Sequence, residues 1–359
     1  MTDTPGHVLF TGGGSAGHVV PCLPLIEHFL RLGTTVSYIG SHSGPEAALI
    51  KPTGAAFFAI RSGKLRRYWS WRNVADVWWV VVGILQAWRL VRRLEPAVLF
   101  SKGGYAAFPV VVAAWLTRVP VVAHESDLTP GLANRLSLPF VAAVCTTFAV
   151  TQFPVRNVPV IHTGTPLRHA LTTGEAARGR ALVGEPELPL VLVVGGSLGS
   201  SALNAAVRAA LGELLEWCCV AHVCGPGHVD ATLTARAGYR QFEYVGDGWG
   251  DLLAAADVVV SRAGANSLYE LVALRKPHLL VPLTRQASRG DQLENAAYAL
   301  ERGWSRVLPE DQLEPARLCE AVRRLYTDRD AVMAALADAG LGDGTAATAR
   351  IICRFARQR

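Results

Sequence analysis

The sequence predicts an α/β protein of two domains, each with a mostly parallel β-sheet covered by helices on both faces. Its 359 residues are enough for about two domains of ordinary size. Short apolar runs alternate with longer helical patterns, and this alternation begins again near residue 188. Half of the residues are hydrophobic and 18% are charged, which excludes a disordered chain, a coiled coil and a collagen-like fibre.

The predicted elements fall into two similar halves. In the first half, apolar runs at 7–11, 35–40, 97–101, 119–124 and 141–148 predict strands, and residues 19–32 and 108–117 predict helices. In the second half, we expect strands at 188–194, 218–223, 257–261 and 278–282 and a helix at 201–215. Prolines 159 and 166 and Gly164 should interrupt any element between residues 158 and 167. The expected domains are 1–163 and 164–341. The last predicted helix, 345–357, could belong to either half, and we assign residues 342–359 to the first domain.

The cysteines and the apolar runs indicate in which cellular compartment the protein is expected. An odd count of seven cysteines without a repeating spacing argues against a disulfide framework and favours a reducing compartment such as the cytoplasm. Cys218, Cys219, His222 and Cys224 resemble a metal cluster, but they lack CxxC pairs and lie in an apolar run typical of a buried strand. No uninterrupted apolar run reaches 18 residues, and the first residues lack the pattern of a signal peptide, so we expect neither a membrane span nor a leader.

A glycine-rich turn follows the first predicted strand. Gly12, Gly14 and Gly17 match the pattern G-x-G-x-x-G, whose backbone can approach a phosphate at a helix N-terminus. The acidic residue that a dinucleotide site needs at the end of the second strand is absent, which weakens the prediction of NAD binding. The alternative is that these glycines form a tightly packed turn that binds no ligand. His18, in the first helical turn, is either a neutral general base or a residue that only hydrogen-bonds the loop.

Two more glycine turns follow predicted strands, at Gly103-Gly104-Tyr105 and at 195–199, which includes Ser197. Turns at the carboxyl ends of strands in two halves would face one interdomain cleft and suit a phosphorylated ligand. Glu270 lies in the first turns of a predicted helix, where its carboxylate could bind ribose hydroxyls or serve only as a helix N-terminal charge. The polar residues at 288–295 could bind sugar hydroxyls.

Seven motifs in order make the sequence similar to one family over nearly its whole length. They are TGGGSAGHVVP, SKGGYAAFP, PVVAHESDLTPGLAN, TGTPLR, VVGGSLG, SRAGANSLYELVALRKP and SRGDQLENA. The chain resembles the MurG family, glycosyltransferases that add N-acetylglucosamine to lipid I in peptidoglycan synthesis and cell wall biogenesis. The resemblance implies a GT-B fold of two Rossmann-like domains, with the acceptor lipid bound by the first and UDP-GlcNAc by the second.

The resemblance also implies roles for particular residues. Gly14, Ser15, Ala16 and Gly17 would lie at the junction of donor and acceptor, and Tyr105 follows the second glycine pair. Arg168 and Ser197 would contact the donor phosphates, Val245 would hold the uracil by its backbone, and Gln292 would bind a sugar hydroxyl. The nucleotide-sugar segment would be Ala265, Asn266, Ser267, Leu268, Tyr269 and Glu270, with Glu270 on the ribose. The sequence departs from the family where Ser15-Ala16 replaces Thr-Gly and Asp127 replaces an asparagine.

The implied reaction is a single displacement with inversion at the anomeric carbon of the sugar. Helix N-termini, Ser197 and Arg168 would stabilise the charge on the leaving diphosphate, so we expect no metal and no cofactor. His18 is the expected base, with Glu125 and Asp127 as rivals. A different glycolipid transferase, a UDP-GlcNAc 2-epimerase, a silent binding protein and a dehydrogenase stay as alternatives.

The basic charge of the chain is concentrated in one segment. Residues 61–93 carry eight basic residues and one acid, a net charge of +7 against +6 for the whole chain, and five of the nine tryptophans. An apolar run at 77–85 within it is too short to span a bilayer but suits interfacial insertion, and Trp78, Trp79, Val82 and Leu85 are the expected contacts with an anionic membrane surface. The alternative is a buried helix with a solvated basic rim, and no nucleic-acid-binding motif accompanies the patch. The enzyme would lie at the cytoplasmic side of the membrane, where cell-wall synthesis and cell division proteins are possible partners.

Overall fold

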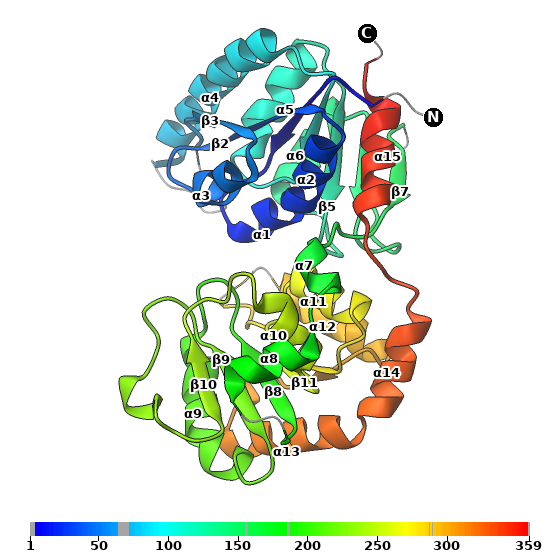
Figure 1. Ribbon diagram of the computed structural model, residues 1–359. Helices are drawn as coiled ribbons and strands as arrows, with labels where there is room; N and C mark the ends of the chain where they lie inside the picture. The colour runs from blue at the N-terminus through cyan, green and yellow to red at the C-terminus, as the bar shows by residue number, and fades with distance from the viewer. Residues whose placement is uncertain are drawn as a thin grey trace. The chain divides into compact units, whose positions relative to one another are not determined.

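The computed structural model describes residues 4–63, 72–154, 157–184, 187–286, 288 and 290–357, and only the backbone of 72–77. The chain divides into two compact units. Unit 1 consists of Met1–Arg168 and Asp343–Arg359, and unit 2 of His169–Gly342. The last helix therefore belongs to unit 1, where α15 (Thr345–Phe355) contacts α2 (Leu23–Arg31), β4 (Val98–Ser101) and β5 (Val121–Glu125) (Figure 1).

Unit 1 contains a parallel sheet of seven strands in the order β3-β2-β1-β4-β5-β6-β7. Besides β4 and β5, the strands are β1 (His7–Thr11), β2 (Thr35–Ser41), β3 (Ala56–Ile60), β6 (Ala143–Thr146) and β7 (Val160–His162). The other helices of this unit are α1 (Ala16–Val19), η1 (Val20–Cys22), α3 (Glu46–Ile50), η2 (Lys51–Thr53), α4 (Arg72–Leu94), α5 (Ala107–Leu116), α6 (Leu132–Ser137) and η3 (Leu138–Phe140).

The two faces of this sheet carry separate hydrophobic cores. Because side chains alternate along a strand, Val8 and Phe10 of β1 join the core with α2 and α15, and Leu9 joins the core with α4 and α5. Ile352 of α15 is fully buried in the first of these cores. Both faces of the sheet are therefore covered, as the apolar character of the predicted strands indicates.

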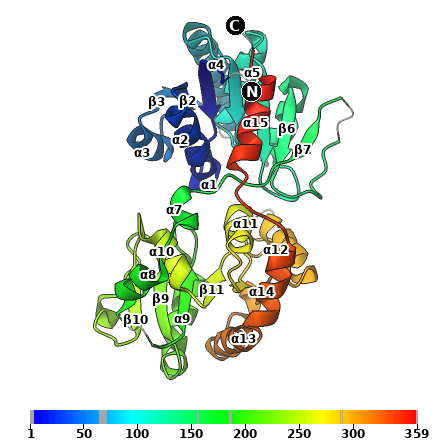
Figure 2. The same cartoon turned by 45° about the vertical axis from the view of Figure 1, so that its right-hand side comes forward.

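Two predictions for unit 1 are wrong. The expected helix over 19–32 is divided into α1, η1 and α2, because Pro21 and Pro24 occupy the first positions of new helical segments and cannot continue the preceding hydrogen bonds. Residues 158–167 were expected to contain no element, but β7 lies there and pairs with β6. As the last strand of the sheet, β7 tolerates Pro159 just before its first residue (Figure 2).

Unit 2 contains a parallel sheet of six strands in the order β10-β9-β8-β11-β12-β13. The strands are β8 (Leu190–Val194), β9 (Cys219–Val223), β10 (Tyr239–Phe242), β11 (Val258–Ser261), β12 (His278–Leu280) and β13 (Arg306–Val307). The helices are α7 (His169–Thr172), α8 (Ala176–Val183), α9 (Ser201–Leu214), η4 (Ala231–Leu233), α10 (Trp249–Ala255), α11 (Ala265–Ala273), α12 (Asp291–Glu301), η5 (Glu310–Gln312), α13 (Pro315–Thr327) and α14 (Arg329–Asp338). The predicted strands and the helix at 201–215 are confirmed to within a few residues.

Strand β9 explains the cysteine-rich string. All five of its residues are buried, and His222 is hydrogen-bonded by Nδ1 to the Tyr239 hydroxyl at 2.8 Å and by Nε2 to Asn204 Oδ1 at 3.0 Å. Both ring nitrogens are therefore used within the core. Within the described residues, no helix is long and apolar enough to span a bilayer, and no group of histidines, cysteines and acids is arranged to hold a metal ion.

Candidate functional site

Each sheet has a switch point where the strand order reverses, and ligands of open α/β sheets bind in the crevice beyond the carboxyl ends of the strands at such points. In unit 1 the order reverses between β1 and β4, and a glycine turn follows each of these strands. We call residues 12–18, 102–105 and 124–127 the unit 1 site. In unit 2 the order reverses between β8 and β11.

The two glycine turns of the unit 1 site pack directly on each other. The backbone N–H of Gly13 donates to the Gly103 carbonyl at 3.2 Å. Gly14 has a φ of +94°, and a Cβ there would overlap the ring of Tyr105. A Cβ at Gly104 would overlap the Gly13 carbonyl and would lie 3.0 Å from His18 Cδ2. Only glycine therefore fits these positions, and the contact between the two turns brings Tyr105 next to Gly14 and His18 next to Gly104.

The residues of the first loop differ in exposure. Gly14, Ser15 and Gly17 are exposed, whereas Ala16, His18 and Tyr105 are half-buried. The backbone N–H of His18 donates to the Ser15 carbonyl at 3.1 Å, which begins the short helix α1. These residues can therefore be reached by a ligand from solvent.

Glu125 is placed differently from the other two candidate bases. It is only 4% exposed, and its carboxylate accepts hydrogen bonds from the backbone N–H groups of Asp127 at 3.0 Å and Gly131 at 2.9 Å, and from Asn134 Nδ2 at 2.9 Å. These bonds fix the loop between β5 and α6. Asp127, on this loop, is half-buried. Glu125 thus holds the loop that carries Asp127.

A buried lysine that the sequence analysis missed lies behind this loop. Lys102 is 2% exposed, and its Nζ donates to His124 Nδ1 at 2.9 Å and to the Ser126 hydroxyl. Burial lowers the pKa of Lys102, while the nearby Glu125 carboxylate opposes this shift. Burial, followed by the charge of Lys102, holds the pKa of His124 well below its usual range. The position of Lys102 directly after an apolar strand and before two glycines, in the string SKGG, could have indicated a buried lysine near the site.

The unit 2 switch point contains a cavity of about 380 Å³. It is lined by the glycine turn after β8, by the starts of α9, α11 and α12 and by the loop after β12, namely Gly195, Gly196, Gly199, Ser200, Ser201, Ala202, Arg262, Gly264, Ser267, Leu283, Gln292 and Glu310. Two predicted substrate-binding residues, Ser267 and Gln292, are therefore brought together. The Gln292 side chain also accepts a hydrogen bond from the Leu283 N–H at 3.1 Å.

An arginine that the sequence analysis missed points into this cavity. Arg262 is 7% exposed and forms an ion pair with Glu310, while it also donates to the Ser200 hydroxyl and, at 3.1 Å, to the Val281 carbonyl. A buried charge needs such a partner and such hydrogen bonds. The guanidinium is therefore held rigidly beside the second glycine turn.

The remaining residues expected in unit 2 are distributed along three elements. On α11, Leu268 and Tyr269 are buried in the core, and the Tyr269 hydroxyl donates to the Gly342 carbonyl at 2.8 Å, so their side chains have structural functions. Ala265 is buried, whereas Asn266 and Glu270 are half-buried on the same helix. The exposed Ser197 lies in the turn after β8.

Two further expected donor contacts lie at other positions. Val245 follows β10 and is half-buried against the core beside α8 and α10. Arg168 is the last residue of the first segment of unit 1, and its Nε is buried with no hydrogen-bond partner among the described residues.

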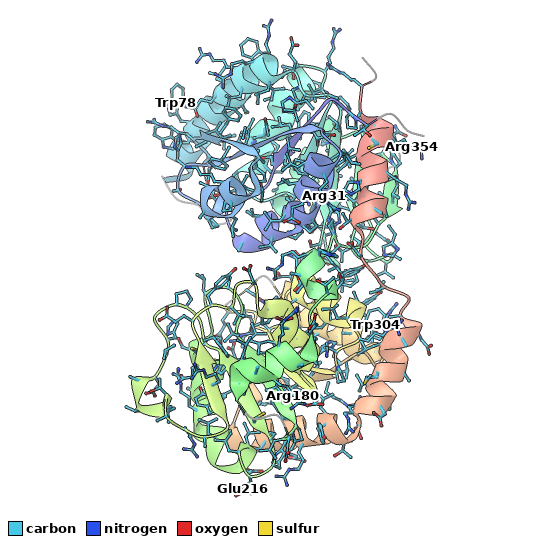
Figure 3. The ribbon with its side chains drawn as sticks, viewed as in Figure 1. Arg31, Trp78, Arg180, Glu216, Trp304 and Arg354 are labelled. Atoms are coloured by element: carbon cyan, nitrogen blue, oxygen red, sulfur yellow. The ribbon has the colours of Figure 1, made fainter. Side chains whose placement is uncertain are left out.

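Apolar side chains are exposed on two adjacent helices of unit 1. On α4, Trp78 is 63% and Leu85 is 53% exposed, and Figure 3 shows Trp78 at the surface of this helix. Trp79 and Val82 are only half-buried, and the Arg61 guanidinium lies 4.6 Å from the Trp79 ring centre. Two exposed residues of α5, Trp115 and Leu116, were not predicted. The basic residues 64, 66 and 67 and tryptophans 69 and 71 lie outside the described residues, as does the side chain of Arg72.

The fold and the two switch-point sites define a class, the two-domain glycosyltransferases of the GT-B fold, as expected from the sequence. Residues 8–146 match the model of the glycosyltransferase family 28 N-terminal domain, and residues 190–346 match that of the C-terminal domain. The chain belongs to glycosyltransferase family 28 and, within it, to the MurG family.

Two curated relatives carry the name UDP-N-acetylglucosamine–N-acetylmuramyl-(pentapeptide) pyrophosphoryl-undecaprenol N-acetylglucosamine transferase. The protein of Legionella pneumophila (strain Paris) is 49% identical over 327 residues, or 90% of each chain. That of Clostridium botulinum (strain Kyoto / Type A2) is 42% identical over 351 residues, or 98% of this chain and 99% of the relative.

Solved structures agree on the fold. The MurG of Acinetobacter baumannii has a TM-score of 0.76 at 24% identity and covers 98% of this chain and 100% of its own. A UDP-N-acetylglucosamine 2-epimerase has a TM-score of 0.67 at 13% identity, with 98% of this chain and 95% of its own covered.

Proposed function

We propose that the protein transfers N-acetylglucosamine from UDP-GlcNAc to the 4-hydroxyl of N-acetylmuramic acid in undecaprenyl-pyrophosphoryl-MurNAc-pentapeptide, with inversion at the anomeric carbon. This reaction converts lipid I to lipid II in peptidoglycan synthesis. The observation that carries the proposal is the name of relatives that are 42% to 49% identical over at least 90% of this chain.

Unit 2 is the proposed donor-binding unit. The cavity at its switch point combines a glycine turn, whose backbone can approach a diphosphate, with the buried Arg262 guanidinium. Ser267 and Gln292 supply neutral polar groups for sugar or ribose hydroxyls. Glu270, Ser197, Arg168 and Val245 remain proposed contacts on the family resemblance.

The proposed mechanism needs charge stabilisation on one side and a base on the other. Negative charge grows on the leaving UDP, and a fixed guanidinium and backbone N–H groups stabilise it without reorganisation during the reaction. His18 is the proposed base for the acceptor hydroxyl, because it is accessible on the first glycine loop. Asp127 is the rival base. The three hydrogen bonds of Glu125 favour a positioning role for that residue instead.

The acceptor carries a polyprenyl chain, so the enzyme must reach a bilayer surface. We place this contact on the exposed apolar residues of α4 and α5, beside the basic residues Arg89, Arg92 and Arg93 at the end of α4. Basic residues next to an apolar strip favour anionic lipid on the cytoplasmic side. The proposal includes proteins of cell-wall synthesis and cell division as partners at that surface.

The transfer assay tests the proposal directly. The purified protein is incubated with UDP-GlcNAc labelled in the sugar and a lipid I analogue, in the presence of EDTA. We expect label in the lipid product and release of UDP. Conversion of UDP-GlcNAc to its 2-epimer without transfer would instead support an epimerase, and absence of any transfer would overturn the proposal.

A further inference from the structure

A fully buried carboxylate lies beneath the first glycine loop. Glu46, the first residue of α3, has an exposure of 0%, and its Oε1 accepts a hydrogen bond from the backbone N–H of Gly14 at 2.8 Å. The Ser41 hydroxyl, at the end of β2, lies 3.1 Å from each carboxylate oxygen. The chain therefore places an anionic side chain of its own on the loop.

The surrounding sequence is adapted to this carboxylate. A Cβ on Gly13 or on Gly44 would overlap it, and a Cβ on Gly40 would lie 3.0 Å from the Cβ of Glu46. Three glycines and a serine from different segments thus leave room for one acidic side chain and satisfy it. Because a buried charge is costly unless it is hydrogen-bonded, this arrangement indicates a specific function for Glu46.

In a glycine loop of this type, the backbone N–H groups ordinarily point to a bound phosphate. Here the N–H of Gly14 donates to Glu46, and the N–H of Gly13 donates to Gly103. The helix that follows, α1, has only four residues and so supplies a small dipole. A phosphate at this loop would also be repelled by the buried negative charge.

The second glycine loop has the opposite character. Gly196 and Gly199 line an open cavity, and the guanidinium of Arg262, which is paired with Glu310, lines the same cavity. The two loops share a sequence pattern, but the first donates a backbone hydrogen bond to a buried carboxylate, whereas the second borders a cavity that a buried guanidinium lines. This difference separates a loop suited to a diphosphate from one suited to an uncharged group.

We propose that Glu46 occupies the anion position of the first glycine loop, so that this loop positions His18 toward an uncharged sugar hydroxyl and excludes phosphate. This inference rests on the proposed acceptor-binding function of unit 1. Glu46 is then a positioning and specificity residue, and the diphosphate of the acceptor binds away from the N–H groups of Gly13 and Gly14.

The test uses inorganic pyrophosphate and the variant Glu46→Gln, which keeps the shape and a hydrogen-bond acceptor for Gly14 but removes the charge. In the unsubstituted enzyme, pyrophosphate should compete with UDP-GlcNAc and not with a lipid I analogue. In Glu46→Gln, inhibition competitive with the acceptor should appear, with an inhibition constant at least about tenfold below the highest pyrophosphate concentration that leaves the acceptor kinetics of the unsubstituted enzyme unchanged. Glu27→Gln, which removes an exposed acid from α2 of the same unit, should behave as the unsubstituted enzyme.

A second measurement needs no variant and no activity. Glycine amide signals of the ¹⁵N-glycine-labelled full chain are followed by NMR during a pyrophosphate titration. Gly13 and Gly14 should not shift, whereas Gly196 and Gly199 should. Shifts at Gly13 and Gly14, or a folded Glu46→Gln enzyme without acceptor-competitive inhibition, would overturn the inference. Failure of the proposed function would instead show as absence of transfer in the unsubstituted enzyme.

Discussion

Replacement of Glu310 by glutamine should separate the stability of unit 2 from its affinity for the donor. Glu310 pairs with Arg262, and the two side chains are 17% and 8% exposed. The change leaves a buried guanidinium without its counter-ion, although the Ser200 hydroxyl and the Val281 carbonyl still accept its hydrogen bonds. We therefore expect lower stability together with tighter binding of UDP.

The magnitudes follow from the burial of the pair. Removing one partner of a buried ion pair costs about 3 to 5 kcal/mol, and the lower value applies because glutamine keeps the shape and Glu310 borders a cavity. For a unit the size of His169–Gly342, about 3 kcal/mol corresponds to a fall in Tm of roughly 6 to 12 °C. At an effective dielectric constant of about 20, an unneutralised positive charge gains up to about 3 kcal/mol from a negative charge about 6 Å away, so after screening by salt the Kd for UDP should fall at least about tenfold.

Calorimetry with and without UDP measures both effects. The matched control is Glu314→Gln, since Glu314 pairs with Arg317 at 3.8 Å with both side chains more than half exposed. Such an exposed pair is worth little, and both Tm and Kd should stay nearly unchanged. An unchanged Tm, or a Kd for UDP that rises in Glu310→Gln, would refute the reasoning.

Four further predictions concern both units. His18→Ala should reduce kcat at least about a hundredfold and remove the acidic limb of the pH–rate profile, and near-normal turnover would exclude His18 as the base. Lys102→Met should move the acidic limb of that profile to higher pH, because loss of a positive charge buried behind the unit 1 site favours the protonated form of the base, whereas Lys276→Met, which removes a lysine bound to the carbonyls of Ala254 and Ala256, should not move it. Leu85→Ala combined with Trp78→Ala should weaken flotation with anionic vesicles about tenfold or more, and Leu182→Ala, an exposed leucine of unit 2, should leave it unchanged. Burial and the charge of Arg208 lower the pKa of His222 from 6.5 to about 3. Between these two pH values His222 takes up a proton in the unfolded chain but not in the folded protein, so the free energy of unfolding should decrease as the pH falls below 6.5. In His222→Gln this decrease should be less steep.

The elements around both switch points could be predicted from the sequence because the signal is local. Apolar runs followed by glycine predict a buried strand and a turn, and β1, β4, β8 and β11 all have this pattern. The strand β7 was missed because its three residues lie between prolines and only the edge of the sheet tolerates such a strand.

The charged residues behind the sites could not be predicted because their partners are distant in the sequence. Arg262 and Glu310 are 48 positions apart, and Gly14 and Glu46 are 32 apart. An acidic residue after Gly44-Pro45 is typical of a solvated helix start, and only the packing of three glycines around Glu46 buries it. On α11, in contrast, the helical spacing of Leu268, Leu271 and Val272 could have indicated that Leu268 faces the core.

Because the chain returns to unit 1 at its end, the order in which the two units can finish folding during synthesis on the ribosome is determined. Ala349 and Ile352 fill the core around Val8 and Phe10, and the backbone N–H of Arg357 donates to the Ala97 carbonyl at 3.0 Å. Unit 1 begins first but cannot close its core until the last helix has been synthesised, whereas all strands of unit 2 have emerged by then. The half that starts the chain therefore finishes folding last, and a fragment ending at Arg168 would expose the face that α15 covers.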